Sequence, residues 1–381
     1  MSIELLSASI VGDVVQIAWQ DGRTMVFPAI WLRDNCRCPA CRHANGQRLF
    51  EITDLPRDLA VKQAAIQDGH LQLVWAPDDH ISAFTASWLV AHELGSDSRA
   101  TRREQPVFWD RSLIDRLPVA DWSALRADTA VEVGWLDQYA AYGFGLLRNV
   151  PTEPGMVEVV GNHLGFVRVT NYGSLFDVIS VPKPNNLAFT AVGLGVHSDN
   201  PYREPTPGVQ LLHCLESDAP GGDTLLVDGF HAAEILRRED PAGFKLLTQL
   251  PLNFRFRDAK ADLQAEAPLI KLDFDGAVKE IHFNNRSADT LNAPVDLVAP
   301  WYAAYRKFAD ILKRPEMELI FKLGAGDLVV MMNERALHGR TAFDPSLGRR
   351  HLQGCYIDKD GIESRHRVLR RQLGLSKDLA A

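Results

Sequence analysis

The sequence predicts a mainly β protein with flanking helices, made of a small all-β domain and a larger double-sheet jelly roll. Three observations support this fold class. Short runs of alternating apolar and polar residues end at turns rich in Gly, Pro and Asp along most of the chain. Three cysteines lie close together in the stretch NCRCPACRH, near the N-terminus. A charged and irregular tract then separates this part from a second series of strands.

The first domain is expected to span residues 1–95 and to consist of β-hairpins. The stretch DVVQIAWQDGRTMVF alternates and turns at residues 20–23, and HLQLVWAPDDHISAF repeats the pattern with a turn at residues 76–79. The stretch ASWLVAHELG then predicts a short helix. The charged tract after it is the expected linker, residues 96–125, and residues 126–381 form the second domain.

The cysteine cluster predicts a structural zinc site, which would stabilise a β domain too thin to fold on its own. Cys36, Cys38 and Cys41 form the pattern C-x-C-x-x-C, in which the first two are too close for an easy disulfide. A redox C-x-x-C pair usually opens a helix, whereas this one contains a proline and follows another cysteine. Zn²⁺ takes four Cys or His ligands in a tetrahedron, and the candidates for the fourth are His43, His70 and His80. His80 is favoured over His43 because it leaves a hairpin turn and can fold back on the cysteines.

The composition indicates an ordinary globular protein and argues against several functional classes. The chain has 381 residues, of which 46% are hydrophobic and 24% charged, and its net charge is -8. This acidic balance argues against a nucleic-acid partner. No apolar stretch approaches the roughly 20 residues needed to cross a bilayer, and the N-terminus lacks the basic and apolar regions of a signal peptide. We therefore expect a cytoplasmic protein without a membrane partner.

The second domain begins with two predicted helices and continues mainly as strands. DTAVEVGWLDQYAAYG and TEPGMVEVVGNHLG predict helices that flank the strand FGLLRNV. The strands expected after them are GVQLLHCLE and DAPGGDTLLVDGF, joined by a Gly-Gly turn, a hairpin that turns at Asp275-Gly276, and GAGDLVVMMNERALHG. Apolar residues at helical spacing in PWYAAYRKFADILK predict one more helix. Many short strands with a few flanking helices are typical of a double-sheet barrel or jelly roll.

Two histidines and one aspartate on these strands are candidate iron ligands. In GVHSDNPY, His197 and Asp199 are two residues apart, so their side chains point to the same face of a strand. A second histidine, His338, lies in the distant stretch NERALHGRTAF. Two His and one carboxylate form the facial triad of non-haem Fe(II) oxygenases, which leaves coordination positions open. An H-x-D pattern alone is common by chance, and an isolated LHG histidine is usually a packed core residue. Whether these residues bind iron therefore depends on the motifs around them.

Six stretches together resemble a known family. They are WLRDNCRCPACRHANGQRLF, HSDNPY, PGVQLLHCLE, GGDTLLVDGF, HGRTAF and RRHLQGCY. In this order they resemble the γ-butyrobetaine hydroxylase branch of the Fe(II)/2-oxoglutarate-dependent, taurine-dioxygenase-like oxygenases, over nearly the whole chain. The resemblance implies a double-stranded β-helix and homodimers. The metal ligands that it implies are His197, Asp199 and His338 for iron, and Cys36, Cys38, Cys41 and His80 for zinc.

The resemblance also implies how the co-substrate 2-oxoglutarate is held. Arg350 in RRH matches the family's anchoring arginine, and Thr224 in GGDT matches the hydroxyl that accompanies it. A guanidinium fixes a carboxylate in plane through two parallel N–H bonds. Related halogenases lack the iron-binding carboxylate, so Asp199 favours hydroxylation, with O₂ as the second co-substrate. Arg349, by contrast, is expected to be a solvated surface residue.

The substrate expected for this branch carries a trimethylammonium group held by aromatic rings. Cation–π attraction and dispersion bind this ion, which cannot donate hydrogen bonds. The matching positions are Tyr172, Phe176, Phe189 and Tyr356. Two phenylalanines depart from the Tyr- and Trp-rich cage of the mammalian type, and ordinary barrel core is the alternative for Phe176 and Phe189.

The anionic end of the substrate is expected to contact Asn200, Asn285 and Arg286. Asn200 directly follows Asp199, where butyrobetaine hydroxylases tend to lack this amide, and Arg286 follows an asparagine that usually faces the substrate carboxylate. A phosphonate has three oxygens and up to two charges, so it would use an added arginine and amide. These residues resemble the related hydroxylase of 2-(trimethylamino)ethylphosphonate, which implies hydroxylation next to phosphorus with release of succinate and CO₂. The alternatives are γ-butyrobetaine as substrate, giving L-carnitine, and Arg286 as a plain surface residue.

Two other functional classes compete with this enzyme. A metal-binding interaction protein with an inactive oxygenase fold has no need of the complete set His197, Asp199, His338 and Arg350. An oxygenase that acts on a protein or nucleic-acid side chain conflicts with the acidic balance and the aromatic cage. The sequence therefore predicts a dioxygenase of a small quaternary ammonium substrate, with Fe(II), 2-oxoglutarate and structural Zn(II).

Overall fold

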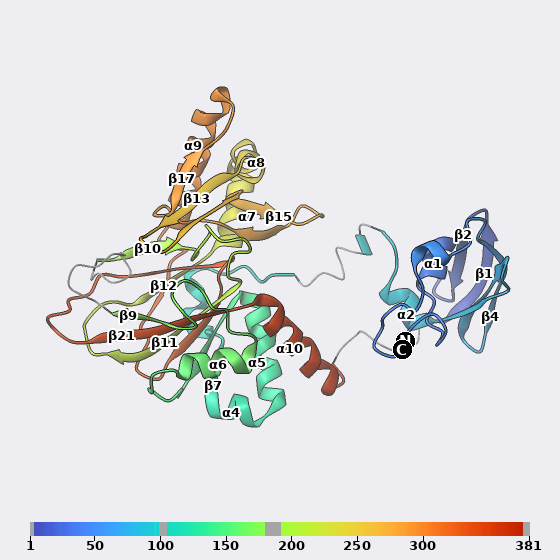
Figure 1. The fold of residues 1–381 in the computed structure, drawn as a ribbon, viewed down its shortest axis with the longest axis horizontal. Coiled ribbons are helices and arrows are strands. Elements are labelled where there is room, and N and C mark those ends of the chain that lie inside the picture. The colour runs from blue at the N-terminus through green and yellow to red at the C-terminus, as the bar shows by residue number, and fades with distance from the viewer. Residues whose placement is uncertain (1–3, 96, 99–104, 180–191, 376–381) are drawn as a thin grey trace. The chain divides into compact units, whose positions relative to one another are not determined.

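The computed structural model describes residues 4–95, 97–98, 105–179 and 192–375 (Figure 1). The chain divides into two compact units, and Gln105–Gly374 form the larger one. Each unit has hydrophobic core clusters of its own. No helix among the described residues is long and apolar enough to cross a membrane.

The smaller unit contains two three-stranded antiparallel sheets, in the orders β1-β2-β3 and β4-β5-β6. Its elements are β1 (Leu5–Val11), β2 (Val14–Trp19), β3 (Thr24–Pro28), α1 (Ala29–Asp34), η1 (Ile52–Asp54), β4 (Ala60–Gln67), β5 (His70–Ala76), β6 (Ile81–Thr85) and α2 (Ala86–Ala91). Both hairpins predicted from the sequence, β2 with β3 and β5 with β6, are confirmed. Alternate residues of β2 and β5 face one shared core because side chains alternate along a strand. The buried ones are Val15, Ile17, Trp19, Leu71, Leu73 and Trp75.

The larger unit contains two main sheets, as expected for a jelly roll (Figure 1). The four-stranded sheet has the order β10 (Leu194–His197), β20 (Ala336–Arg340), β12 (Thr224–Asp228) and β18 (Leu319–Phe321). The six-stranded sheet has the order β7 (Val119–Asp121), β8 (Phe144–Arg148), β19 (Leu328–Met332), β11 (Val209–Ser217), β21 (Arg350–Ile357) and β9 (Phe176–Ile179). Side chains from both sheets, such as Leu226 and Met331, share one buried cluster. The predicted double-sheet fold class is therefore confirmed, with β11 and β12 in different sheets rather than in one hairpin.

Helices and smaller sheets surround these two sheets. The smaller sheets contain β13 (Leu252–Arg257), β14 (Asp262–Ala267) and β17 (Ala288–Leu291), and the predicted hairpin of β15 (Ile270–Leu272) with β16 (Val278–Ile281). The helices are α5 (Thr129–Tyr142), α6 (Met156–Leu164), α7 (Gly229–Glu239), α8 (Pro241–Gln249), α9 (Val295–Leu312) and α10 (Lys359–Gln372). Helix α5 starts where the Asp128 carboxylate accepts a hydrogen bond from the Ala130 N–H, and ends at Gly143, whose φ is +77°. Helix α9 is confirmed but begins before the predicted stretch and includes Pro300.

The segment before α5 belongs to the larger unit. It contains η2 (Arg111–Arg116), β7 and α4 (Trp122–Ala127). A buried ion pair between Arg335 and Asp228, at 3.1 Å, fixes it, because Arg335 donates to the Val107 carbonyl and Asp228 accepts from the Trp109 N–H. These partners are 228 and 119 residues apart in sequence. The structure therefore differs from the expected linker, residues 96–125, in its second part, and local sequence could not reveal this attachment.

Candidate active site and metal centres

The three candidate iron ligands converge at the end of the four-stranded sheet. His197 on β10 and His338 on β20 are direct cross-strand partners, and their ring centroids are 4.4 Å apart. Asp199 follows β10 closely, with its Oδ1 3.3 Å from His197 Nε2 and its Oδ2 3.9 Å from His338 Nε2. One ligand atom of each residue lies within 4.8 Å of the others. Pairing of β10 with β20 thus brings together residues that are far apart in the chain.

The chemistry of these three side chains fits a metal ion. The Nδ1 atom of His197 lies 3.0 Å from the Gly195 carbonyl, which can only accept, so Nδ1 donates and Nε2 keeps its lone pair for a metal. Burial lowers the pKa of His338 to about 3, so this imidazole is neutral at physiological pH. Burial would raise the pKa of Asp199, but hydrogen bonding to the carboxylate, including the bond from the Tyr356 hydroxyl, lowers it overall, so the carboxylate is ionised. Two imidazoles and one carboxylate are the donors of a facial triad.

Asp199 is held by Asn333 and Gln210, which the sequence did not single out, and by Tyr356, which was expected only at the substrate. The Asn333 side chain accepts from the Asp199 N–H at 2.7 Å and donates to the Asp199 carbonyl at 2.9 Å. Gln210 Nε2 and the Tyr356 hydroxyl donate to Asp199 Oδ2 at 2.6 Å and 2.8 Å. The available signal was an uncharged amide within a mostly apolar strand, as in GVQLLHC, or directly after one, as in VVMMNER.

A group of arginines lies beside the triad. Arg350 Nε donates to the Gly222 carbonyl at 3.2 Å, two residues before the buried Thr224 on β12. Arg340, which the sequence did not single out, lies two residues after His338 and directly across from Thr224. Burial, together with the charges of Arg350 and Arg286, lowers the pKa of Arg340 to about 10. Several positive charges held close together out of water favour a site that binds anions.

Aromatic side chains form a cluster next to Asp199. The ring centroid of Phe176 lies 5.2 Å from Tyr356 and 6.3 Å from Tyr172, so three of the four predicted cage residues are brought together. Phe256, which sequence reasoning missed, stacks on Tyr202 at 5.3 Å and meets Tyr172 edge-on at 6.0 Å. Tyr202 belongs to the HSDNPY motif itself, which was the available signal. The fourth predicted cage residue, Phe189, lies outside the described residues.

The three residues predicted to contact the anionic end of the substrate differ in where they lie. Asn200 is buried with φ at 54°, and its Oδ1 accepts from the Tyr202 hydroxyl, while its Nδ2 has no hydrogen-bond partner among the described residues. Arg286 keeps exposed surface, yet its charge contributes to lowering the pKa of His338 and of Arg340, so its guanidinium lies toward the triad. The exposed Asn285, by contrast, accepts a hydrogen bond from Tyr305 of α9. Its buried neighbour Asn284 donates to the Ser198 carbonyl, between two candidate ligands.

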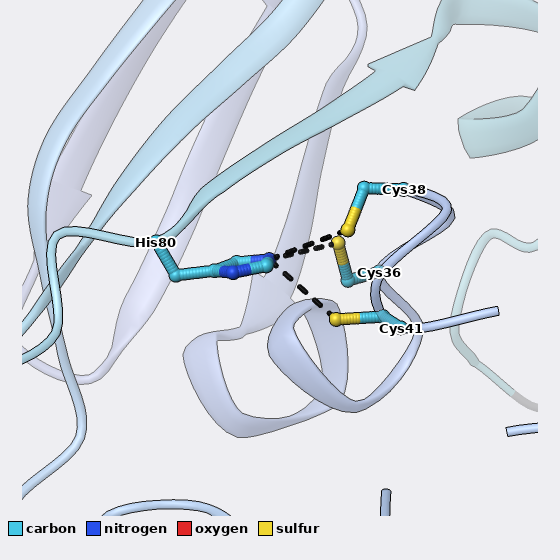
Figure 2. A group of neighbouring side chains, drawn as sticks. All are labelled: Cys36, Cys38, Cys41 and His80. Carbon is cyan, nitrogen blue, oxygen red and sulfur yellow. Dashed lines mark hydrogen bonds between the residues drawn. The ribbon is translucent and has the colours of Figure 1, made fainter. Parts of the chain in front are cut away.

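A second group of candidate ligands lies in the smaller unit (Figure 2). His80 Nε2 lies 3.3, 3.7 and 3.6 Å from the Sγ atoms of Cys36, Cys38 and Cys41, respectively. Ligands bound tetrahedrally at about 2.3 Å for Zn–S and about 2.0–2.1 Å for Zn–N would lie roughly 3.5–3.6 Å apart. The donors and their spacing therefore fit a closed Cys₃His zinc site.

The two other histidine candidates are engaged elsewhere, and one arginine faces the thiols. His43 Nδ1 accepts from the Asn45 N–H, and His70 Nδ1 contacts the Asp68 carbonyl at 2.8 Å. Arg33 Nη1 donates to Cys41 Sγ at 3.4 Å. Burial nevertheless raises the pKa of the Cys41 thiol to about 11, so a metal has to displace this proton when it binds.

Comparison with known proteins adds independent findings. Residues 110–356 match the family described as taurine catabolism dioxygenase TauD, TfdA family, and residues 7–90 match the family described as gamma-butyrobetaine hydroxylase-like, N-terminal. The chain is 40% identical to a gamma-butyrobetaine dioxygenase of Pseudomonas sp. (strain AK-1), with 96% of each chain covered. It is 33% identical to the gamma-butyrobetaine dioxygenase of Homo sapiens, over 94% of this chain and 95% of the relative. It is 31% identical to a trimethyllysine dioxygenase of Meyerozyma guilliermondii, over 97% of this chain and 96% of the relative.

Proposed function

Because this chain belongs to the TauD, TfdA family and is an Fe(II)/2-oxoglutarate-dependent dioxygenase, we propose that it hydroxylates a small trimethylammonium zwitterion. The observation that carries the proposal is the pairing of a His-Asp-His triad with a neighbouring aromatic cluster. Such rings suit a cation that cannot donate hydrogen bonds, because they attract it through their π faces. The arginines beside the triad suit the anionic groups of 2-oxoglutarate and of the substrate.

The residues have separate roles in this proposal. His197, Asp199 and His338 would hold the iron, which would supply the oxidising chemistry. The co-substrates are 2-oxoglutarate and O₂, and the co-products are succinate and CO₂. Arg350, which donates to the Gly222 carbonyl, binds the far carboxylate of 2-oxoglutarate, and the hydroxyl of Thr224, two residues after Gly222, assists it. The aromatic residues orient the trimethylammonium head and exclude water.

The homodimer that the resemblance implies is a further proposal. Light scattering of the purified protein would measure its oligomeric state.

γ-Butyrobetaine is the proposed substrate that the comparisons support, with L-carnitine as the product. Two relatives that cover at least 94% of the chain, one bacterial and one human, are named for this compound. The test is turnover of γ-butyrobetaine by purified enzyme with Fe(II), 2-oxoglutarate and O₂, in which succinate and hydroxylated product are followed together. Failure to hydroxylate any trimethylammonium zwitterion would overturn the proposed function.

A second candidate substrate is 2-(trimethylamino)ethylphosphonate, hydroxylated at the carbon next to phosphorus. The specific observations in its favour are the Arg286 charge beside the triad and the buried Nδ2 of Asn200, which has no hydrogen-bond partner among the residues that the structure describes. A charge-assisted hydrogen bond contributes on the order of 1.5–3 kcal/mol, enough for a tenfold or greater preference in kcat/KM. A dianion with three oxygens gains more from these donors than a carboxylate does.

Side-by-side turnover of both compounds decides between them. If the phosphonate is the substrate, wild type prefers it and Arg286→Ala narrows the preference about tenfold or more. Arg349→Ala is the matched control, because Arg349 is exposed and pairs with Glu216 at 2.8 Å. Preference of the wild type for γ-butyrobetaine, or unchanged selectivity in Arg286→Ala, rejects the phosphonate and leaves the trimethylammonium proposal intact.

A further inference from the structure

Two residues on neighbouring strands donate hydrogen bonds to the same oxygen of Asp199. Gln210 on β11 and Tyr356 on β21 are direct partners in the antiparallel register, so their side chains lie next to each other on one face of the six-stranded sheet. Gln210 Nε2 reaches Asp199 Oδ2 at 2.6 Å and the Tyr356 hydroxyl reaches it at 2.8 Å. Both donors are buried, with exposed fractions of 2% and 4%. The other oxygen, Oδ1, faces His197 Nε2.

Tyr356 also belongs to the aromatic cluster. Its ring centroid lies 5.2 Å from that of Phe176, at an interplanar angle of 32°. The hydroxyl and the ring of this one side chain therefore contact different parts of the site. The hydroxyl contacts a candidate iron ligand, and the ring contacts a residue proposed to hold the trimethylammonium head.

Hydrogen bonds of this kind decide how a carboxylate faces a metal. A bond from a neutral donor to a carboxylate is charge-assisted and stronger than a bond between neutral groups. Two such bonds on Oδ2 occupy its lone pairs and orient the carboxylate so that Oδ1 is the freer oxygen. Partners of this type affect metal binding strongly, since their removal typically costs about 10–100-fold in affinity or activity.

We propose that Gln210 and Tyr356 are a pair of positioning residues that orient Asp199 for the iron, and that Tyr356 thereby joins the aromatic cluster to the metal centre. This inference rests on the proposed assignment of iron to His197, Asp199 and His338. The two parts of the Tyr356 side chain then have different roles. The hydroxyl affects metal binding through Asp199, and the ring contacts the substrate.

The test is titration of the full-length, zinc-loaded protein with Mn(II), with free Mn(II) counted by electron paramagnetic resonance. Mn(II) suits imidazole and carboxylate ligands and competes poorly for thiolates, so the zinc site does not interfere. Tyr356→Phe and Gln210→Met should each weaken Mn(II) binding about tenfold or more. Tyr202→Phe is the matched control, because it removes a buried hydroxyl from the same cluster that does not contact Asp199, and its Mn(II) affinity should equal that of the wild type.

A kinetic measurement checks the division of roles. At saturating iron, Tyr356→Phe should change KM for γ-butyrobetaine little, because the ring remains. Phe176→Leu should show the opposite pattern, with a raised KM and unchanged Mn(II) affinity. Equal Mn(II) affinity in the wild type, Tyr356→Phe and Gln210→Met would overturn the inference.

The design keeps two failures apart. His338→Ala should lose most Mn(II) binding, because it removes one of three protein ligands. If it binds Mn(II) as the wild type does, the proposed iron site is wrong. If His338→Ala loses the metal while both positioning variants keep wild-type affinity, the iron site stands and only the inference about Gln210 and Tyr356 fails. Thermal unfolding of each zinc-loaded variant before Mn(II) is added shows whether a loss of affinity reflects loss of the fold.

Discussion

The two candidate metal sites are built in opposite ways. In the smaller unit, three ligands come from one short loop, Cys36 to Cys41, and the fourth comes from a single hairpin turn. In the larger unit, His197 and His338 come from strands that are distant in sequence and meet only through the pairing of β10 with β20. The first site offers four donors and the second offers three.

The number of donors separates a structural role from a chemical one. Four protein ligands complete a zinc tetrahedron and leave no position for a reactant, so the first site can only stabilise the chain around it. Three ligands on one face leave positions at which 2-oxoglutarate and O₂ can bind. Gln210 and Tyr356 donate hydrogen bonds to the Asp199 carboxylate, and Asn333 exchanges hydrogen bonds with the Asp199 backbone, so these residues add an outer layer of positioning groups. A site that must turn over needs such control of ligand orientation.

The largest effect is expected from removing a ligand of the open site. His197→Ala or His338→Ala should abolish iron-dependent turnover, because each variant leaves two of three protein ligands. The zinc content of the protein and the unfolding temperature of the smaller unit should stay at wild-type values. His70→Ala serves as the matched control, since this exposed histidine lies in the other unit. Substantial activity in either ligand variant would rule out the triad.

The next effect concerns the closed site. Cys38→Ser should lower zinc content and destabilise the smaller unit, because structural zinc contributes on the order of 10–16 kcal/mol of apparent binding free energy to such folds. His43→Ala, a change at a nearby histidine that contacts Asn45 instead, should keep its zinc. Metal analysis and thermal unfolding measure both outcomes. Unchanged zinc content in Cys38→Ser would show that the ligand set is wrong.

A smaller effect is expected at the proposed 2-oxoglutarate anchor. Arg350→Ala should cost about 2–5 kcal/mol of binding, because it breaks a largely buried charge-assisted pair, so the apparent KM for 2-oxoglutarate should rise about 30-fold or more. Arg349→Ala should leave this KM near the wild-type value. Steady-state kinetics with varied 2-oxoglutarate provide the measurement. Equal KM values for 2-oxoglutarate in both variants would show that Arg350 does not bind this co-substrate.

The smallest expected effect is the pH dependence of metal affinity. Burial raises the pKa of Cys41 to about 11, so zinc must displace a proton, and its affinity should fall roughly tenfold per pH unit for each proton released as the pH is lowered. Burial lowers the pKa of His338 to about 3 and the pKa of Asp199 is also low, so both are already in their ligand forms. Chelator competition between pH 7 and pH 8.5 should therefore show a steeper slope for zinc than for Mn(II). Equal slopes of affinity against pH for zinc and Mn(II) would contradict the expected difference between the two metal sites.

The sequence was informative where the determinants are local. The C-x-C-x-x-C loop and the H-x-D motif each place ligands within a few residues, so their spacing indicated candidate metal sites. Asp199 lies after the end of β10, however, and not on the same strand as His197. The double-sheet fold class followed from many short strands and is confirmed.

Determinants that depend on distant partners could not be predicted in this way. The amides of Gln210 and Asn333 acquire their roles only when Asp199 is brought beside them, and nothing in GVQLLHC or VVMMNER identifies that partner. The attachment of the segment around Trp109 depends on a buried Arg335–Asp228 pair. Asn285 was expected at the substrate, whereas its amide accepts a hydrogen bond from Tyr305, because α9 packs against that loop.

We expect the Cys₃His site to maintain the fold and the His-Asp-His site to perform the chemistry. The most direct measurement is turnover of γ-butyrobetaine and of 2-(trimethylamino)ethylphosphonate by protein that contains zinc but no iron, before and after Fe(II) is added. We expect this protein to be folded and inactive. Added Fe(II) should restore, in the presence of 2-oxoglutarate and O₂, the formation of one succinate for each hydroxylated product. Turnover before iron is added, or its absence afterwards with both compounds, would contradict this account.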